Sequence, residues 1–353
     1  MNNGLRSVYW INGKIIVIDQ SKLPFQINYL VLRKLDEIIN AIATMKVRGA
    51  PLLGVIGALG LAQIAYYSEG CSADSVIERL KDGASALIRT RPTAANLCNA
   101  VERILKAAMN SPNPRRDAID EALRIVDEEV SASVRIAEIG QTLIDSNDVI
   151  LTHCNTGSLA TVTLGTALGI IIHAHRLGKR ITVYFTETRP ILQGARLTAV
   201  ELIKEGIKCY LIPDSAAAYV IKVKGVNKVI VGADRILNDG TVFNKIGTLQ
   251  IAIAAREHHV EFYVAAPLSS LDFRSRVSEV VVEERDKNEL IFIKNQRIAP
   301  VGIDVFNPSF DVTPSHYIDG IVTDRGIAFK PFTETLKLLY RRYVEMAKVS
   351  VRS

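Results

Sequence analysis

The order of apolar and polar positions changes twice along the chain. Two short β-prone runs, at 8–11 and 14–19, flank the pair Asn12-Gly13. Both residues of this pair tolerate the positive φ that a tight turn requires, so we expect a β-hairpin. From about residue 31 to 144 the apolar spacing becomes helical. The segments expected to be helices are 32–46, 51–68, 74–88, 93–109 and 115–144. Residues 1–130 are therefore predicted to form a small sheet with a helical domain.

After residue 145 short β-branched runs alternate with amphipathic stretches. The expected strands are 149–152, 181–185, 207–211, 228–232 and 261–265, and the expected helices include 158–176, 193–205 and 246–258. Strands separated by helices of this length form βαβ units, which build a parallel sheet covered on both faces. Residues 131–353 are thus predicted to form a doubly wound α/β domain, whose ligands bind beyond the carboxyl ends of the strands.

The composition narrows the class of protein. Of 353 residues, 48% are hydrophobic and 23% charged, which is typical of a globular chain and excludes disordered, collagen-like and disulfide-rich classes. The net charge of +6 is a mild excess, and it fits an anionic small molecule at least as well as nucleic acid. The apolar run at 50–66 is too short and too rich in glycine for a membrane span. We therefore expect no nucleic acid and no membrane among the partners.

Cysteine usage indicates the compartment. The four cysteines, at 71, 98, 154 and 209, include no C-x-x-C pair, and residues 1–11 do not resemble a secretory leader. This pattern is typical of a reduced cytoplasmic protein with free thiols.

Polar residues follow four of the expected strands. Because carboxyl ends of parallel strands meet at one edge of a sheet, we expect a thiol, carboxylates, arginines and an amide to share one crevice. These stretches are His153–Ser158, Glu187–Pro190 with Gln193-Gly194, Pro213–Ser215 and Ala233–Arg235. Such a concentration predicts a functional site.

Two of these residues are candidates for chemistry. Cys154 comes directly before an expected helix, whose N-terminus favours the thiolate, although a buried cysteine can also pack as a small hydrophobe. Asp234 follows a buried run, where desolvation favours the protonated acid and hence a proton donor, although an Asx turn is an equal alternative. Because side chains alternate along a strand, His153 is expected to point to the opposite face, where it either supports the site residues from behind or is simply buried. Asn155–Ser158 opens the expected helix and predicts either an anion site or an ordinary N-cap.

Basic residues near helix starts suggest that the ligand is an anion. Lys245, after Asn244, precedes an expected helix and suits a phosphate, although surface lysines are commoner. Arg48 lies in a turn between two expected helices, and Arg89 and Arg91 directly precede another. Two arginine-bearing turns in one domain and a polar crevice in the other predict an enzyme whose phosphorylated substrate contacts both domains.

At these same residues the sequence resembles the methylthioribose-1-phosphate isomerases. Their superfamily includes archaeal ribose-1,5-bisphosphate isomerase and the regulatory subunits of eukaryotic initiation factor two-B. The resemblance runs in order from about residue 8 to 335. The matching stretches are Asp19-Gln20, Leu23-Pro24, Arg48–Pro51, Arg91–Ala94, Asn96-Leu97, Thr152–Gly157, Glu187–Pro190, Gln193–Ala199, Gly232–Arg235, Asn244–Thr248, Val264–Pro267 and Asn307–Pro314.

The resemblance implies a function and a site. It implies an aldose–ketose isomerase of methionine salvage that converts 5-methylthioribose 1-phosphate to 5-methylthioribulose 1-phosphate, with a Rossmann-like C-terminal domain. It implies a homodimer with no metal or organic cofactor, and the sequence has no His/Cys/carboxylate cluster at metal-ligand spacing. It also implies Cys154 and Asp234 as the catalytic pair. The implied substrate contacts are Arg48, Gly49, Ala50, Arg91, Gln193, Asn244 and Lys245.

Two other functions remain open from the sequence. A ribose-1,5-bisphosphate isomerase needs a second phosphate site, and the stretch from Trp10 to Pro24 resembles the methylthioribose enzymes instead. A non-catalytic regulatory subunit resembling the initiation factor has no physical need for Cys154 together with Asp234. The sequence does not choose between an enolate route and a hydride shift for the hydrogen transfer.

Overall fold

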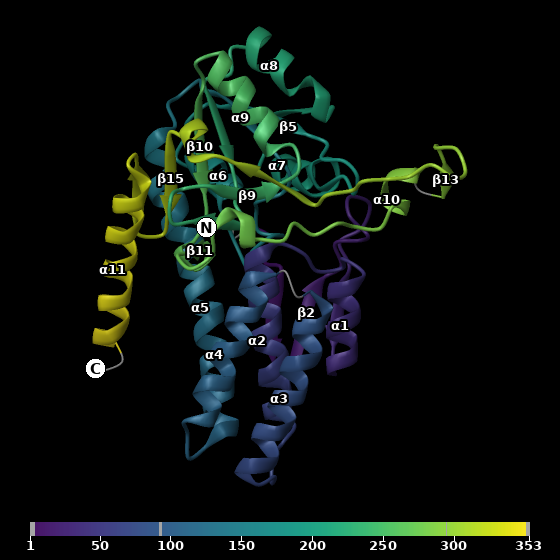
Figure 1. Ribbon diagram of the computed structural model, residues 1–353, viewed down its shortest axis with the longest axis vertical. Helices are drawn as coiled ribbons and strands as arrows, with labels where there is room; N and C mark the ends of the chain where they lie inside the picture. Colours follow the sequence, from purple (N-terminus) through teal and green to yellow (C-terminus); the bar gives the residue numbers. More distant parts are fainter. Residues whose placement is uncertain (1–3, 92–93, 294, 351–353) are drawn as a thin grey trace. The chain divides into compact units, whose positions relative to one another are not determined.

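The structure is a computed structural model that describes residues 4–91, 94–293 and 295–350, which divide into two units (Figure 1). The first unit comprises Met1–Arg135 and Thr156–Gly169, and the second comprises Ile136–Asn155 and Ile170–Ser353. Pro92 and Thr93, which belong to one of the stretches quoted above, lie outside the described residues. The predicted domain boundary near residue 130 stays a prediction.

The first unit begins with a small antiparallel sheet, in the order β1-β2-β3. Its strands are β1 (Val8–Ile11), β2 (Lys14–Ile18) and β3 (Tyr29–Leu32). Asn12 and Gly13 connect the first two with φ of 49° and 76°, so the predicted hairpin is confirmed. The third strand was not foreseen, and its last residue was assigned to the helix expected over 32–46.

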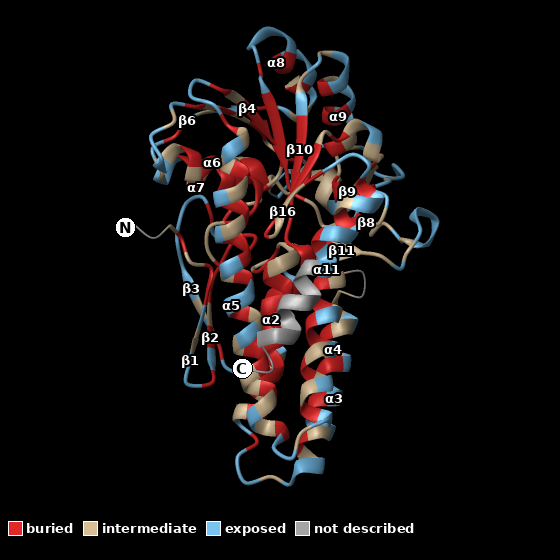
Figure 2. Ribbon diagram, turned by 90° about the vertical axis from the view of Figure 1, so that its left-hand side faces the viewer, coloured by how far each residue is buried: buried red, intermediate tan, exposed pale blue. Residues whose placement is uncertain are grey.

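Helices make up most of the remainder of the first unit. They are α1 (Leu35–Ala43), α2 (Ala50–Tyr66), α3 (Ala73–Thr90), α4 (Ala95–Met109) and α5 (Pro114–Gly140), of which the last residues belong to the second unit. The expected helices are confirmed, with ends that differ by a few residues. Helix α2 is buried over most of its length (Figure 2). A Cβ on Gly57 would lie 2.3 Å from Leu97 Cδ1, so this glycine lets α4 approach closely.

The second unit is built on a large sheet of order β16-β15-β10-β7-β4-β5-β6. The strands from β6 to β15 pair in parallel, and β16 is antiparallel to β15. The expected strands are confirmed to within one residue, whereas β15 and β16 were not foreseen. The bounds are β4 (Val149–Thr152), β5 (Thr182–Thr186), β6 (Lys208–Ile212), β7 (Lys228–Val231), β10 (Glu261–Ala265), β15 (Gly320–Thr323) and β16 (Gly326–Phe329).

The order of these strands defines the fold. The chain runs outward from β4 through β5 to β6, then returns to the other side of β4 for β7, β10 and β15. This is the strand order of a Rossmann fold, and right-handed crossovers then place helices on opposite faces. The covering helices are α6 (Ala167–Arg176), α7 (Ala199–Lys204), α8 (Ala217–Val223) and α9 (Thr248–Glu257). The predicted doubly wound α/β class is confirmed, and its topological switch point lies between β4 and β7.

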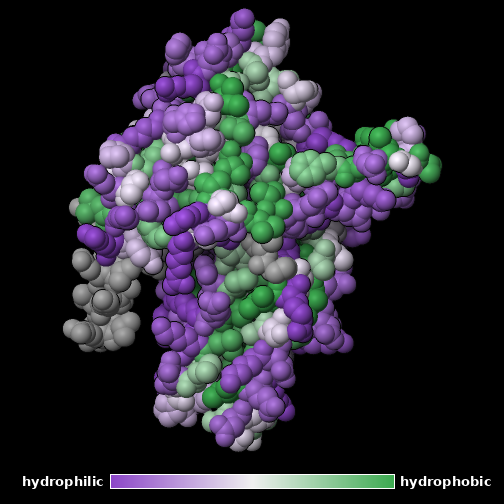
Figure 3. All heavy atoms as spheres, viewed as in Figure 1, coloured by the Kyte–Doolittle hydropathy of each residue, from purple (hydrophilic) through white to green (hydrophobic). Residues whose placement is uncertain are grey.

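A smaller sheet and an arm extend the second unit. The small sheet has the order β11-β8-β9-β14, with β11 (Leu271–Asp272), β8 (Arg235–Leu237), β9 (Val242–Lys245) and β14 (Phe310–Thr313). The arm carries α10 (Asn288–Ile291), β12 (Phe292–Ile293) and β13 (Gln296–Arg297), and helix α11 (Phe332–Ser350) ends the described chain. The tip of the arm exposes apolar side chains (Figure 3). Within the described residues, no helix is long and apolar enough to cross a membrane.

The expected helix over 158–176 is wrong in its first half. Helix α6 begins only at Ala167, and the preceding residues turn back on themselves. Gly157 and Gly165 form a short antiparallel bridge, and the Thr166 amide donates to the Thr156 carbonyl at 2.8 Å. A Cβ on Gly165 would lie 2.4 Å from Gly157 Cα, so this approach requires glycine. Periodicity missed it because the apolar residues of this segment are buried without being helical.

Candidate active site

The two candidate catalytic residues follow neighbouring strands. Cys154 comes two residues after the end of β4, and Asp234 comes three after the end of β7. The two strands pair in parallel, so their carboxyl ends lie at the same edge of the sheet. They also flank the switch point, where doubly wound sheets bind their ligands. Both residues therefore occupy the position in the second unit where this fold places an active site.

Lys245 at the end of β9 lies within electrostatic reach of both residues. Its side chain is buried, so the alternative of an ordinary surface lysine is wrong. Burial lowers the pKa of Lys245, and the charges of Cys154 and Asp234 oppose that shift. A buried ammonium beside a thiol and a carboxyl can attract a phosphate or a developing oxyanion.

Asn244, the neighbour of this lysine, is also buried. Its Nδ2 donates to Thr248 Oγ1 at 2.9 Å, and that hydroxyl donates to the Lys245 carbonyl at 2.6 Å. The amide therefore helps to fix the turn that leads from β9 into α9.

Cys154 is held in an unusual backbone conformation. Its φ is 65°, a value that few residues other than glycine adopt. Its amide donates to Thr188 Oγ1 at 3.1 Å, and Thr198 Oγ1 donates to its carbonyl at 2.6 Å. Strained backbone that neighbouring groups hold in place clusters at active sites. The sequence predicted that a helix begins directly after this thiol, but in the described residues the next helix, α6, begins only at Ala167. The two threonines fix the position of the residue instead.

Gln193 contributes a buried amide just beyond β5. Within the described part of the chain, its Oε1 is buried and has no hydrogen-bond partner. A buried acceptor without a partner costs free energy, which a donor on a bound ligand would recover. A π-helical turn, Gly194–Thr198, follows directly, and such turns are frequent at functional sites. A Cβ on Gly194 would lie 1.8 Å from the Thr186 carbonyl oxygen, so the turn packs closely on the end of β5.

His153 is buried and neutral. Its Nε2 lies 2.9 Å from the Ile246 carbonyl and its Nδ1 lies 2.6 Å from Thr186 Oγ1. Burial lowers the pKa of His153 to about 4, against hydrogen bonding to Ile246 and the charge of Asp214, which raise it, while Lys245 lowers it further. The expectation of a buried histidine on the face opposite Cys154 agrees with these contacts.

Because of His153, we expect the folded protein to lose stability in acid. The pKa of this histidine is near 6.5 in an unfolded chain and about 4 in the folded one, so protonation favours unfolding. The stabilisation is fully present above pH 6.5 and is lost as the pH falls toward 4. We expect the free energy of unfolding of the wild type to fall by about 3 kcal/mol more than that of His153→Gln between pH 7 and pH 4. Urea unfolding at both pH values measures this, and equal losses in the two proteins would contradict it.

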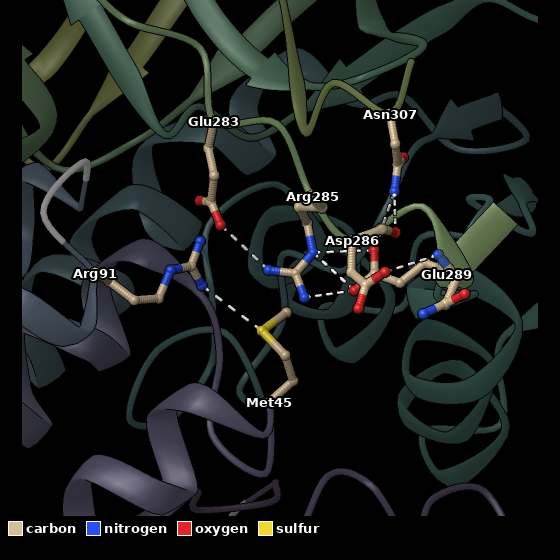
Figure 4. A network of polar contacts seen from close by, with 8 residues as sticks. Met45, Arg91, Glu283, Arg285, Asp286, Glu289 and Asn307 are labelled. Carbon is tan, nitrogen blue, oxygen red and sulfur yellow. Dashed lines mark hydrogen bonds and ion pairs between the residues drawn. The ribbon is translucent and has the colours of Figure 1, made fainter. Parts of the chain in front are cut away.

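The segment 283–289, which leads into the arm, carries charged residues that the sequence analysis did not identify as part of the site. Arg285 pairs with Glu283 and Glu289, and Asn307 Nδ2 donates to the Asp286 carbonyl at 3.1 Å (Figure 4). The charges of Arg285 and Glu289 both act on Lys245. The only signal in the sequence was a run of charged residues at 283–289, which is equally typical of an exposed loop.

A further carboxylate fixes the start of α9. Asp311 Oδ2 accepts from the Gly247 amide at 2.7 Å and the Leu249 amide at 3.0 Å. Burial raises the pKa of Asp311 to about 6, although these amides and the charge of Lys245 lower it. Asp311 lies on β14 opposite Asn244, a pairing that sequence periodicity did not reveal because β9 and β14 are short and far apart in the chain.

The remaining candidate residues lie in the first unit. Arg48 is buried, and Gly49 has a φ of 99° at the start of α2, which Ala50 opens. A Cβ on Gly49 would lie 2.5 Å from Ala160 Cα, and the Leu52 amide donates to the Ala160 carbonyl at 3.1 Å. The predicted turn between two helices is confirmed, and it packs on the segment that follows Cys154 in the chain.

Arg91 follows α3 and is also part of the first unit. Its Nη1 lies 3.6 Å from the sulfur of Met45. The structure therefore brings Cys154, Asp234 and Lys245 together in the second unit, and it describes Arg48, Gly49, Ala50 and Arg91 in the first. Over the described residues, no group of three or more His, Cys, Asp or Glu side chains could hold a metal ion.

Comparison with known proteins gives the family. The Rossmann-type strand order, with a thiol and a carboxyl at its switch point, places the chain among the α/β proteins that bind ligands at this edge of the sheet. Within that class, the chain belongs to the initiation factor 2 subunit family, whose model matches residues 46–330. A methylthioribose-1-phosphate isomerase from Desulforudis audaxviator is 44% identical, over 94% of this chain and 97% of that protein.

Solved structures agree with this assignment. The structure of 5-methylthioribose 1-phosphate isomerase from Pyrococcus horikoshii is 40% identical, with a TM-score of 0.87 over 95% of this chain and 96% of that one. A structure described as translation initiation factor eIF-2B, subunit delta, from A. fulgidus is 41% identical, with a TM-score of 0.85 over 96% of this chain and 99% of that one.

Proposed function

We propose that this chain is an aldose–ketose isomerase that converts 5-methylthioribose 1-phosphate to 5-methylthioribulose 1-phosphate in methionine salvage. Relatives of that name share more than two-fifths of their residues with it over nearly the full length. The observation that carries the proposal is the position of Cys154 and Asp234 just beyond the ends of two neighbouring strands at the switch point, with the buried Lys245 within electrostatic reach of both.

The substrate explains why an acid is needed. A phosphate on carbon 1 prevents the sugar from opening to a free aldehyde, so the bond between carbon 1 and the ring oxygen must be broken with assistance. Asp234 donates its proton to the ring oxygen as that bond breaks. A site that excludes water strengthens this step, because the developing charges are then stabilised by fixed groups.

Hydrogen then moves from carbon 2 to carbon 1. In one route the Cys154 thiolate removes the proton from carbon 2, and the thiol so formed gives a proton back to carbon 1 of the enolate. In the other route a hydride shifts directly between the carbons. In both, the carbon 2 hydroxyl becomes a carbonyl, and its proton replaces the one that Asp234 gave up, so substrate and product are isomers. Solvent deuterium at carbon 1 of the product distinguishes the enolate route from the hydride shift.

Other residues bind the substrate in this proposal. The cationic side chains of Arg48, Arg91 and Lys245 neutralise the phosphate, and the Gly49-Ala50 backbone helps to fix the sugar. The amides of Gln193 and Asn244 bind hydroxyl groups, and the buried, unpartnered Oε1 of Gln193 in the described structure supports this role.

A substrate comparison tests the function. We expect the purified protein to use 5-methylthioribose 1-phosphate with a kcat/KM at least 100-fold above that for ribose 1,5-bisphosphate, because a pocket for an apolar methylthio group leaves a second phosphate desolvated and unpaired. Product formation is followed by proton NMR. Equal use of both substrates would contradict the assignment.

A regulatory subunit is the second candidate, because one similar structure is described as an eIF-2B subunit. Absence of isomerase activity together with specific capture of the alpha subunit of that initiation factor would favour it. Measurable turnover in the purified chain favours the isomerase instead.

We also propose that the protein is a cytoplasmic homodimer that works without a metal or organic cofactor. Apolar side chains exposed on the arm and on the segments that lead into and out of it support self-association, among them Val281, Val301 and Phe306. The molar mass in solution, measured by light scattering, tests this state.

A further inference from the structure

A chain of buried hydrogen bonds connects the Cys154 turn with the turn that follows Lys245. It runs from the Ile246 carbonyl to His153, then to Thr186 Oγ1, and on to Thr188 Oγ1, which lies 3.2 Å from the Thr186 hydroxyl. Thr188 Oγ1 in turn accepts from the Cys154 amide. All three side chains are at most 1% exposed, so water does not compete for these bonds.

The chemistry of the groups fixes the direction of this chain. A carbonyl can only accept, so His153 Nε2 carries the proton and donates to Ile246. The ring is neutral, so its Nδ1 must accept, and the Thr186 hydroxyl must donate to it. The Thr186 oxygen then accepts from the Thr188 hydroxyl at 3.2 Å, and the single proton of that hydroxyl is shared with the Thr186 carbonyl at 3.3 Å.

The chain ends at two strained or crowded points of the backbone. Cys154 and Thr188 both have a positive φ, of 65° and 66°. At the other end, a Cβ on Gly247 would lie 3.1 Å from His153 Cε1, so the turn after Lys245 packs directly on the imidazole ring. Both candidate catalytic elements, the thiol turn and the lysine turn, thus rest on the same buried side chains.

We propose that His153, Thr186 and Thr188 are positioning residues that set the Cys154 thiol relative to Lys245. The proposal rests on the proposed function only for its kinetic readout. The three residues do not touch the substrate. They hold the conformation in which the thiol is presented, and a shift of about 1 Å at such a group can lower the rate as much as 100-fold.

Thr186→Val tests the central bond, because valine keeps the shape of threonine and removes the hydroxyl. We expect kcat to fall about tenfold, the scale of one lost buried hydrogen bond, with KM unchanged. Thr186→Ser restores the hydroxyl and is expected to keep wild-type kcat. Thr182→Val, on the same strand β5, is the matched control and is expected to behave as wild type.

Alkylation of the thiols gives a readout that does not depend on isomerase activity. Iodoacetamide labelling followed by peptide mass spectrometry reports each cysteine separately. In Thr186→Val we expect Cys154 to react about tenfold faster, because its turn is no longer held, while the rate at Cys209 on β6 stays unchanged. The labelling rates test the positioning role even if the protein does not catalyse this isomerisation.

Thr188→Val and the double variant Thr186→Val with Thr188→Val distinguish hydrogen bonds that act as one connected chain from hydrogen bonds that act independently. If the hydroxyls act as one unit, Thr186→Val with Thr188→Val has no larger effect on Cys154 labelling than either change alone. Multiplied effects, or wild-type labelling and kcat in folded Thr186→Val, would overturn the proposal. Failure of Thr186→Ser to restore both quantities would overturn it too. Should Thr186→Val not fold, Thr188→Val alone carries the same expectations.

Discussion

Cys154→Ser is expected to lower kcat more than 100-fold without changing the fold. A serine hydroxyl has nearly the same size as the thiol, so the strained turn and its two threonine contacts can persist. The hydroxyl is a far weaker acid, so in the enolate route it does not supply the anionic base that removes the carbon 2 proton. The loss then has the scale of a positioned acid or base, about 100-fold or more.

Asp234→Asn is expected to lower kcat by the same scale, of about 100-fold or more, for the complementary reason. An asparagine amide fills the same space beyond β7, but it cannot protonate the ring oxygen. Asp234 follows a buried central strand at the switch point and lies within electrostatic reach of Lys245. The substitution therefore removes an acid from the position where the proposed reaction needs one.

Both changes are measured as kcat by NMR, with thermal unfolding recorded beside it. Cys209→Ser on β6 is the matched control, because it makes the same chemical change on a strand of the same sheet, at a residue without a proposed role. It is expected to retain wild-type kcat. Full activity of either Cys154→Ser or Asp234→Asn in a folded protein would refute the catalytic pair.

Much of this site followed from local patterns in the sequence. The β-branched runs before Cys154 and Asp234 identified β4 and β7, and the rule that parallel strands share one carboxyl edge placed the two residues together. This prediction of the strands and their shared edge succeeded because a βαβ unit is a local pattern whose handedness and spacing vary little.

The features that the sequence did not predict depend on contacts between segments that are distant in the chain. The turn over 157–166 is fixed by glycine bridging and by packing on Gly49, neither of which has a periodic signal. Lys245 is buried because β9 pairs with β14, about seventy residues later in the chain, which apolar spacing does not encode. The resemblance to a family supplied the reaction, which no pattern of strands and helices could supply.

Gly49→Ala is expected to destabilise the first unit strongly. The combination of a φ of 99° and a ψ of 129° lies outside the left-handed helical region and is unfavourable for any residue with a Cβ, which costs about 1–3 kcal/mol. The new atom would also lie 2.5 Å from both Cα and O of Ala160, and this is backbone that cannot rotate away. Overpacking of this kind costs a further 1–3 kcal/mol, so we expect the free energy of unfolding to fall by about 3 kcal/mol.

Gly70→Ala separates the two causes of that loss. Gly70 has a similar φ of 79°, and among the described residues no atom lies within 4 Å of the position that its Cβ would take. This variant pays only the conformational penalty, and urea unfolding is expected to show a loss of about 1 kcal/mol. Because Arg48 precedes Gly49 directly, Gly49→Ala should also raise KM about tenfold, whereas Gly70→Ala should leave it unchanged. Equal losses of stability and an unchanged KM in both variants would show that the contact with Ala160 neither holds this turn nor presents Arg48 to the substrate.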